Sequence, residues 1–259
     1  MAAGRSKGAR AIWGSLGIVL LLALWALGHR LYGPLVLPGL DETASALLRM
    51  MRDGTVGPAL AATAGHAGLG WFAGAAVGIF AGTLAGLREE VRLTLQPVAT
   101  ILLGIPAIAW VVLALLWFGG SWAVVFTVAV ATGPLVFAAA TQGACSLDGD
   151  LARMARAFRA PASAMALDVY GPHMASHLFP ALTTALAMSW KVSVMAELLS
   201  GAGGIGDGLA AARARVDTAE TMAWIVVVVA VLITVDHLLV RRLQRRMDLW
   251  REDPRSTAS

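Results

Sequence analysis

Six long apolar runs dominate this chain, and each is close to the length that a helix needs to cross a lipid bilayer. A transmembrane helix takes about 20 mostly apolar residues. Charged residues make up 14% of the chain, against about 25% in a typical soluble domain, and mean hydropathy is +0.72. A lone chain with such continuous runs does not form a barrel, whose strands alternate apolar and polar residues. The predicted spans lie at about 11–28, 57–86, 93–118, 122–142, 178–199 and 221–240.

The sequence therefore predicts an all-α, polytopic membrane protein, and its basic residues predict how the spans are oriented. Short cytoplasmic loops carry an excess of Lys and Arg. If the spans alternate across the membrane, one side holds 14 of the 20 Lys and Arg residues and the other holds five, with Lys191 inside a span. We expect the richer side, with both termini, to be cytoplasmic. The expected parts are an N-terminus with an uncleaved first span (1–28), an external amphipathic segment (29–56), a membrane core (57–240) with a cytoplasmic loop (143–177), and a basic cytoplasmic tail (241–259).

Composition and motifs argue against several classes of function. The single cysteine, Cys145, excludes an internal disulfide. The basic residues are scattered over short loops, so the net charge of +4 does not indicate nucleic-acid binding. The GxGxxG spacing at 201–206 follows a membrane span instead of a strand, which predicts a turn and not a dinucleotide site. His173 and His177 have metal-ligand spacing on a helix, but no third ligand is evident, so we expect interfacial polar residues, no metal and no bound cofactor.

A regular glycine pattern runs along the second predicted span. Glycines four residues apart form one groove without side chains on a helix, which lets a second backbone approach closely. We favour a helix-packing role, and a hinge or sliding surface is the alternative. The glycines are Gly70, Gly74, Gly78, Gly82 and Gly86.

Two charges fall within the fifth predicted span. Ionisable residues inside a membrane are costly and indicate function by default. Lys191 and Glu197 point about 120° apart on a helix, so they are not an obvious pair. A substrate pathway and structural hydrogen bonding are both open for each. Pro106 interrupts the third span, and such breaks in membrane helices tend to line cavities or helix contacts.

A basic insert containing prolines separates the fourth and fifth spans. It reads RMARAFRAPASAMALDVYGPHMASHLFP from 153 to 180. Arg153, Arg156 and Arg159 recur at every third residue, and prolines follow them. The charges predict a cytoplasmic location for this insert.

Three stretches together resemble the permease subunit of bacterial ABC importers, in the nitrate/sulfonate/taurine branch of the binding-protein-dependent transport superfamily. The stretch at 106–119, PAIAWVVLALLWFG, is similar to that branch's run from proline to LWFG. The stretch at 189–209, SWKVSVMAELLSGAGGIGDGL, is similar to its tryptophan, alanine-glutamate and glycine-rich turn. The insert occupies the place of the family's EAA loop, and the resemblance covers nearly the whole chain.

The resemblance implies that the insert couples the membrane helices to a separate cytoplasmic ATPase. In the family this loop forms coupling helices that dock on the ATPase, and arginines there could pair with acidic groups. The match departs from the family pattern, because Arg153 stands at its glutamate and Arg159 at its glycine. Topology control by positive charge is the alternative interpretation. The implied coupling residues are Arg153, Ala155, Arg156, Arg159, Ala160, Pro161 and Pro172.

The resemblance also implies the function and the partners. We expect a permease, not an enzyme, that works with a second permease, two ATPases that hold ATP and Mg²⁺, and an external substrate-binding protein, surrounded by membrane lipid. The substrate would be a small solute, such as a sulfonate, taurine or nitrate. An ion-coupled carrier using Glu197 and Asp236, or a membrane-embedded enzyme using His173 and His177, are the alternatives. The implied translocation pathway runs near Pro106, Trp110, Trp190, Lys191 and Glu197.

Overall fold

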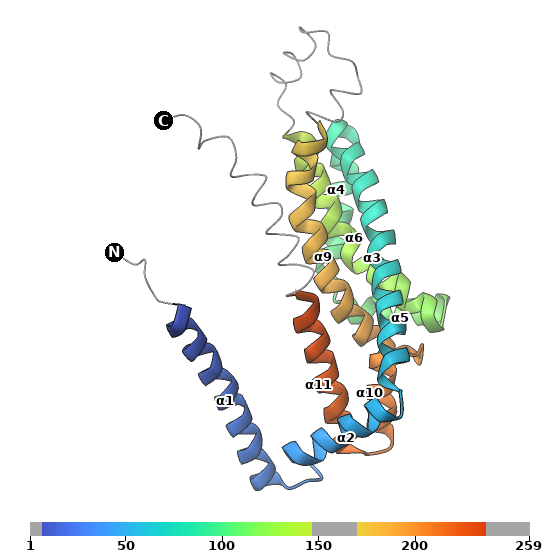
Figure 1. Cartoon of the computed structure of the whole chain (residues 1–259). Coiled ribbons are helices and arrows are strands. Elements are labelled where there is room, and N and C mark those ends of the chain that lie inside the picture. The colour runs from blue at the N-terminus through green and yellow to red at the C-terminus, as the bar shows by residue number, and fades with distance from the viewer. Residues whose placement is uncertain (1–6, 147–169, 237–259) are drawn as a thin grey trace. The chain divides into compact units, whose positions relative to one another are not determined.

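The computed structural model of the chain describes residues 7–146 and 170–236, and every regular element within these ranges is a helix. The predicted all-α membrane fold is confirmed. The helices are α1 (Lys7–Tyr32), α2 (Leu40–Arg52), α3 (Val56–Leu87), α4 (Glu89–Gly104), α5 (Ala107–Trp117), α6 (Gly120–Cys145), α9 (Gly171–Ser200), α10 (Ile205–Ala214) and α11 (Thr218–Val235) (Figure 1).

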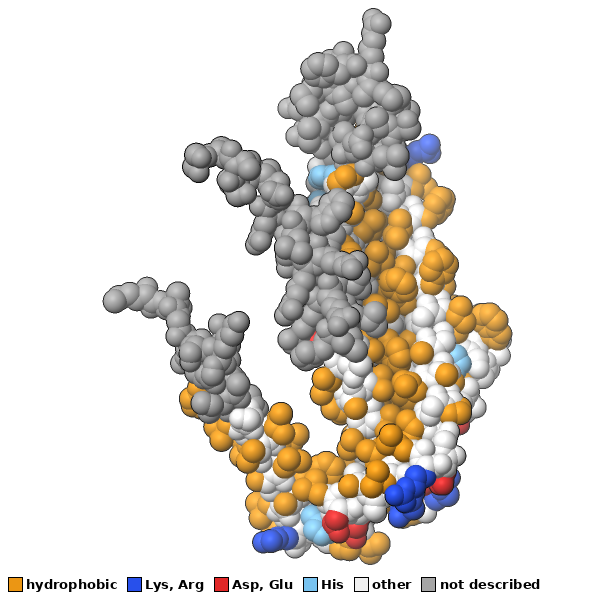
Figure 2. Space-filling view, viewed as in Figure 1, with side chains coloured by type: hydrophobic (Ala, Val, Ile, Leu, Met, Phe, Trp, Pro, Cys, Tyr) orange, Lys and Arg blue, Asp and Glu red, His pale blue; other side chains and the backbone are white. Residues whose placement is uncertain are grey.

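Five of the described helices are long and apolar enough to cross a membrane, and α4 with α5 would make a sixth broken span. The loop expected at 143–177 begins and ends in helix, because α6 continues to Cys145 and α9 starts at Gly171. Hydrophobic side chains are spread along the visible face of α3 (Figure 2). Leu69, Phe72 and Phe80 on this helix are each more than half exposed, as expected of side chains that face lipid.

The span expected at 93–118 is not a straight helix. It divides into α4 and α5, which meet at 99°. Pro106 has no backbone N–H to continue the helix of α4, and a residue before proline disfavours the helical conformation. Ile105 accordingly has an extended backbone, with φ −79° and ψ 125°. The interruption predicted at Pro106 is therefore present, and α4 and α5 together form a bent pair in place of one straight helix.

The chain forms two compact units, which are described separately. The first comprises Met1–Gly57 and Leu209–Val227. Within it, the indole N–H of Trp25 on α1 donates to the carbonyl of Pro38 at 2.9 Å, and Thr218 donates to Pro34 at 3.1 Å. These bonds hold the irregular segment that leads from α1 into α2.

The second unit comprises Pro58–Gly208 and Val228–Ser259, and its helices α3, α4, α6 and α9 run side by side (Figure 1). A seam of glycines joins α3 to α6. A Cβ atom added at Gly74 or Gly78 would come within 3.0 Å of a backbone carbonyl oxygen of α6. The same is true of a Cβ at Gly70, Gly82 or Gly86. Thr141 of α6 also donates to the carbonyl of Gly82 at 3.2 Å. Each glycine of the sequence pattern thus lies where two backbones meet.

Candidate functional site

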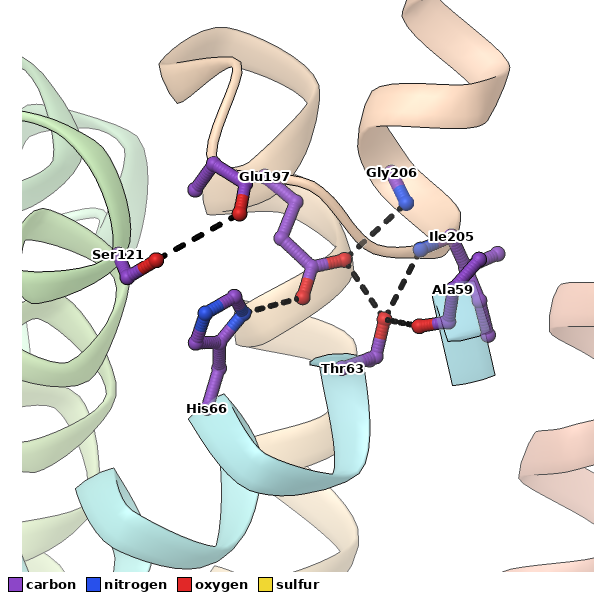
Figure 3. Close-up of polar contacts among 8 residues, drawn as sticks. Ala59, Thr63, His66, Ser121, Glu197, Ile205 and Gly206 are labelled. Carbon is purple, nitrogen blue, oxygen red and sulfur yellow. Dashed lines mark hydrogen bonds and ion pairs between the residues drawn. The ribbon is translucent and has the colours of Figure 1, made fainter. Parts of the chain in front are cut away.

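A buried carboxylate lies at the centre of one cluster of polar contacts in the second unit. Glu197, near the end of α9, has an exposed fraction of 0%. Its Oε1 lies 2.8 Å from Nδ1 of His66, and its Oε2 accepts a hydrogen bond of 2.8 Å from the hydroxyl of Thr63 (Figure 3). The backbone N–H of Gly206 donates to the same Oε2 at 3.1 Å. One side chain therefore connects α3, α9 and the start of α10.

The first turn of α10 contributes a second link to this cluster. The N–H of Ile205 donates to the hydroxyl oxygen of Thr63 at 2.9 Å (Figure 3). Two free N–H groups at the start of a helix, together with the positive end of its dipole, favour a negative charge beside them. The carboxylate of Glu197 occupies that position. The cluster thus satisfies the helix terminus and compensates the buried charge at the same time.

The glycine-rich turn after α9 is what lets the carboxylate and α10 come together. Gly201 ends α9 in the left-handed conformation, with φ 59°, and Gly204 has φ 101°. A Cβ at Gly204 would overlap the carboxyl group of Glu197, and a Cβ at Gly206 would overlap the carbonyl oxygen of Val194. The sequence correctly predicted a turn here. The structure adds that two of its glycines leave room for the carboxylate and for α9.

This geometry bears on what Glu197 can do. The carboxylate is enclosed and accepts from three different donors, so it offers no open position for a solute. Of the two interpretations left open by the sequence, the contacts favour structural hydrogen bonding. We regard the cluster as a joint that ties the end of α9 to α3 and α10.

Lys191 is in a different environment, although it lies only six residues earlier on α9. It is exposed on the surface of the chain, whereas the neighbouring Val192 and Ser193 are buried. Val192 packs with Val111 of α5 and Val128 of α6 in the apolar core of this unit. Because that core fixes the rotation of α9, the lysine faces away from its own helix bundle.

The remaining residues of the predicted pathway lie at intermediate or exposed positions. Pro106 is exposed at the bend between α4 and α5, while Trp110 and Trp190 are partly buried. The indole nitrogen of Trp110 is buried and has no hydrogen-bond partner among the described residues. The five predicted residues therefore do not converge on one site, because Glu197 lies inside the unit and Lys191 on its surface.

The predicted ATPase-coupling residues are mostly outside the described residues. This holds for Arg153, Ala155, Arg156, Arg159, Ala160 and Pro161. Pro172 is described, and it lies exposed in the first turn of α9, where a proline needs no N–H partner.

Thr63 and His66 are the site residues that the sequence analysis missed. Both are buried polar residues in a helix that is otherwise apolar or small. A buried polar group needs a hydrogen-bond partner. Glu197 also needs hydrogen-bond partners. The presence of such residues in both predicted spans could have indicated that α3 contacts α9.

Comparison with known proteins finds a family that matches most of this chain and several similar proteins. Residues 74–249 match the family described as binding-protein-dependent transport system inner membrane component. The taurine transport system permease protein of Escherichia coli is 28% identical over 239 residues, which cover 90% of this chain and 86% of that protein. The nitrate import permease protein of Synechocystis sp. is 28% identical, over 74% of this chain and 73% of that protein. The bicarbonate transport system permease protein of Synechococcus elongatus is 30% identical, over 73% of each.

The fold has a counterpart among solved structures. An inward-facing structure of the MetNI methionine ABC transporter contains a chain that aligns with a TM-score of 0.59. The alignment covers 71% of this chain and 92% of that chain, at 18% sequence identity. At this identity the match supports the shared fold alone.

Proposed function

This chain belongs to the family of binding-protein-dependent transport system inner membrane components, and from that premise we propose that it forms half of a pathway for a small anion. The permease role in an ABC importer, the multi-pass inner-membrane location and the absence of an enzymatic role follow from the family, as the sequence motifs predicted. The substrate, the partners and the orientation are our proposals.

The proposed partners follow the organisation that the sequence resemblance implies. Two ATPase subunits, which bind ATP and Mg²⁺, would dock on the cytoplasmic loop at 143–177. A second permease, identical or different, would complete the pathway. A soluble binding protein would deliver the solute on the outer side, at 29–56 and 200–220, with both termini of the chain in the cytoplasm. The excess of Lys and Arg on the terminal side supports this orientation.

Lys191 is the observation that carries the proposal of an anionic substrate. An exposed ammonium group within a membrane span is costly unless it faces water or another protein surface. The rotation of α9 turns Lys191 away from its own unit, so a water-filled pathway shared with the second permease would satisfy it. The taurine, nitrate and bicarbonate permeases among the relatives are named for small solutes that carry an anionic group.

The charge of Lys191 is not cancelled by the acidic residue on the same helix. Glu197 already receives hydrogen bonds from Thr63 and Gly206 and contacts His66, and it is fully buried. The exposed face of α9 therefore presents a positive charge. Such a charge at a pathway raises the local concentration of anions.

Reconstitution of the complete transporter in vesicles would test this function. The vesicles would contain the chain with its ATPase and binding protein, and the assay would follow ATP-dependent uptake of a sulfonate, nitrate or bicarbonate. Lys191→Met keeps the length of the side chain and removes its charge. We expect uptake to fall at least about tenfold, which corresponds to about 1.4 kcal/mol, and Lys191→Arg to restore much of it.

Lys7→Met is the matched control, because it removes the only other lysine of the chain, which lies outside the predicted spans. Uptake should be unchanged in this variant. Unchanged uptake and affinity in Lys191→Met would contradict the role of the lysine. Uptake that proceeds without ATP would instead favour the carrier interpretation.

A further inference from the structure

Two histidine rings converge on one hydroxyl group at the junction of α6 and α9. His173 and His177 lie one helical turn apart on α9, with ring centroids 5.0 Å apart. Nε2 of His173 lies 3.1 Å from Oγ of Ser146, and Nε2 of His177 lies 3.4 Å from the same atom. Ser146 comes directly after α6, so three polar atoms from two segments share one location.

The distances match those of a tetrahedral metal site. Zinc lies about 2.0 to 2.1 Å from nitrogen or oxygen ligands, so the edges of its tetrahedron measure about 3.3 to 3.4 Å. The two separations from Ser146 Oγ to the histidine nitrogens, 3.1 and 3.4 Å, are close to these edges. Two of the edges that join these three atoms thus have lengths close to those of a tetrahedral site.

A metal ion at this location would need the tautomer in which Nε2 of each histidine carries the lone pair, with Nδ1 of His177 also 3.2 Å from Oγ of Ser176. The hydroxyl of Ser146 donates to the carbonyl of Gln142 at 2.8 Å, so its own lone pairs can face the histidines. Nδ1 of His177 lies 3.2 Å from the carbonyl oxygen of His173. A metal-bound histidine commonly donates its second N–H to a carbonyl oxygen in this way, which fixes the ring and exposes the other nitrogen.

The backbone of α6 accommodates the second ring closely. A Cβ added at Gly143 would lie 3.2 Å from the Cβ of His177, closer than most such contacts. The absence of a side chain at Gly143 thus lets the imidazole lie against α6. Both histidines are partly buried, so the site would be accessible to an ion without being fully solvated.

We propose that His173, His177 and Ser146 form a binding site for a divalent transition metal ion, with zinc as the best match. The described residues contain no cluster of three or more His, Cys, Asp or Glu side chains that could hold a metal. Water would complete the coordination, which is the arrangement of an exchangeable site and not of a closed structural one. The site revises the expectation that this pair is only interfacial.

Because of its location, a bound ion would regulate transport, an inference that rests on the proposed function. Ser146 lies near the start of the segment 143–177, which is proposed to couple the ATPase to the membrane helices, and His173 and His177 lie at its end. An ion held by ligands from both ends of this segment would fix the end of α6 to the start of α9. We infer that zinc binding slows transport by restraining the two helices that leave the coupling segment.

Titration of the purified, untagged, full-length chain with zinc would test the site. Isothermal titration calorimetry should give one ion per chain, and zinc should raise the unfolding temperature, because an ion that binds only the folded state stabilises it. His173→Ala and His177→Ala should each weaken binding at least about tenfold, and Ser146→Ala should weaken it less. His29→Ala, in the first unit, is the control and should bind zinc as the original chain does.

Two outcomes would overturn the site: no stoichiometric binding by the original chain, or unchanged binding in the double variant His173→Ala/His177→Ala. Co²⁺ would check the geometry in the same proteins, since a tetrahedral site gives it an intense visible absorption. In the reconstituted transporter, zinc should reduce ATP-driven uptake in the original chain but not in the double variant. Zinc binding without that inhibition would overturn only the regulatory consequence, and the absence of any ATP-driven uptake would instead count against the proposed function.

Discussion

His66 and Glu197 are 131 residues apart in the sequence, and their side chains meet at 2.8 Å in the interior of the second unit. The contact joins the beginning of α3 to the end of α9. It is the most enclosed charged contact among the described residues, because the glutamate has no exposed surface and the histidine very little. The buried cluster thus joins α3 to α9, and a second polar contact joins the same helices, because the indole N–H of Trp71 donates to the carbonyl of Leu182 at 3.1 Å.

The first prediction concerns the stability that this joint provides. Glu197→Ala would leave the ring of His66 and the N–H of Gly206 without their partner, whereas the hydroxyl of Thr63 would still donate to the carbonyl of Ala59 at 3.1 Å. Removing one partner of a buried pair costs about 3–5 kcal/mol in soluble proteins, whereas single polar contacts in membrane proteins average about 0.6 kcal/mol. Because His66 and Gly206 lose their partner together, we expect a loss of about 2–4 kcal/mol in the free energy of unfolding. Reversible unfolding in detergent would measure it.

Glu89→Ala is the matched control for this prediction. The side chain of Glu89 is 72% exposed and pairs with the partly exposed Arg92 one turn along the same helix. Such surface pairs contribute about 0–1 kcal/mol. Equal losses in the two variants would mean that the buried cluster does not stabilise the fold.

The second prediction concerns the glycines that face the cluster. Gly206→Ala would place a methyl group against the carbonyl oxygen of Val194, which belongs to the backbone and cannot rotate away. We expect the free energy of unfolding of this variant to fall by about 1–3 kcal/mol, as it does when a core is overpacked. We also expect transport to be lost, because α10 moves away from Glu197. Uptake and unfolding would be measured on the same preparation.

Gly203→Ala separates backbone strain from the close contact. Gly203 has φ 77°, but a Cβ there would meet nothing within 4 Å. The free energy of unfolding of Gly203→Ala should fall by only about 1 kcal/mol, which is the cost of a left-handed conformation for alanine. A Gly203→Ala variant that is more damaged than Gly206→Ala would show that the contact with Val194 is unimportant.

Patterns of neighbouring residues in the sequence predicted the helices of this fold better than they predicted which residues of different helices are in contact. Runs of apolar residues predicted the helices, and the four-residue glycine spacing indicated the face of α3 that meets α6. Pro106 indicated an interruption, but the 99° angle depends on how α5 packs on α6 and α9, which no local rule gives. His66 was missed for the same reason, because its partner is 131 residues away.

The third prediction concerns the seam between α3 and α6. Gly78→Ala would bring a methyl group into the carbonyl oxygen of Gly133 and the side chain of Val136. The two helices would have to separate, and we expect the free energy of unfolding to fall by about 1–3 kcal/mol. Gly65→Ala on the same helix meets nothing within 4 Å, so it should be neutral or stabilise the helix by up to about 1 kcal/mol. Similar unfolding curves for the two variants would contradict a packing role and favour the hinge interpretation.

The fourth prediction separates the two interpretations of the arginines in the central insert. If they contact the ATPase, changing Arg153, Arg156 and Arg159 to glutamate should abolish its co-purification while the chain stays correctly inserted. Cys145, the only cysteine, is exposed at the end of α6 and reports that insertion through labelling by a membrane-impermeant thiol reagent from the cytoplasmic side. Changing Arg241, Arg242 and Arg245 to glutamate reverses the same number of charges in the basic tail and should leave the ATPase bound. Retention of the ATPase by the insert variant would contradict the coupling role, and loss of Cys145 labelling in that variant would favour topology control by positive charge.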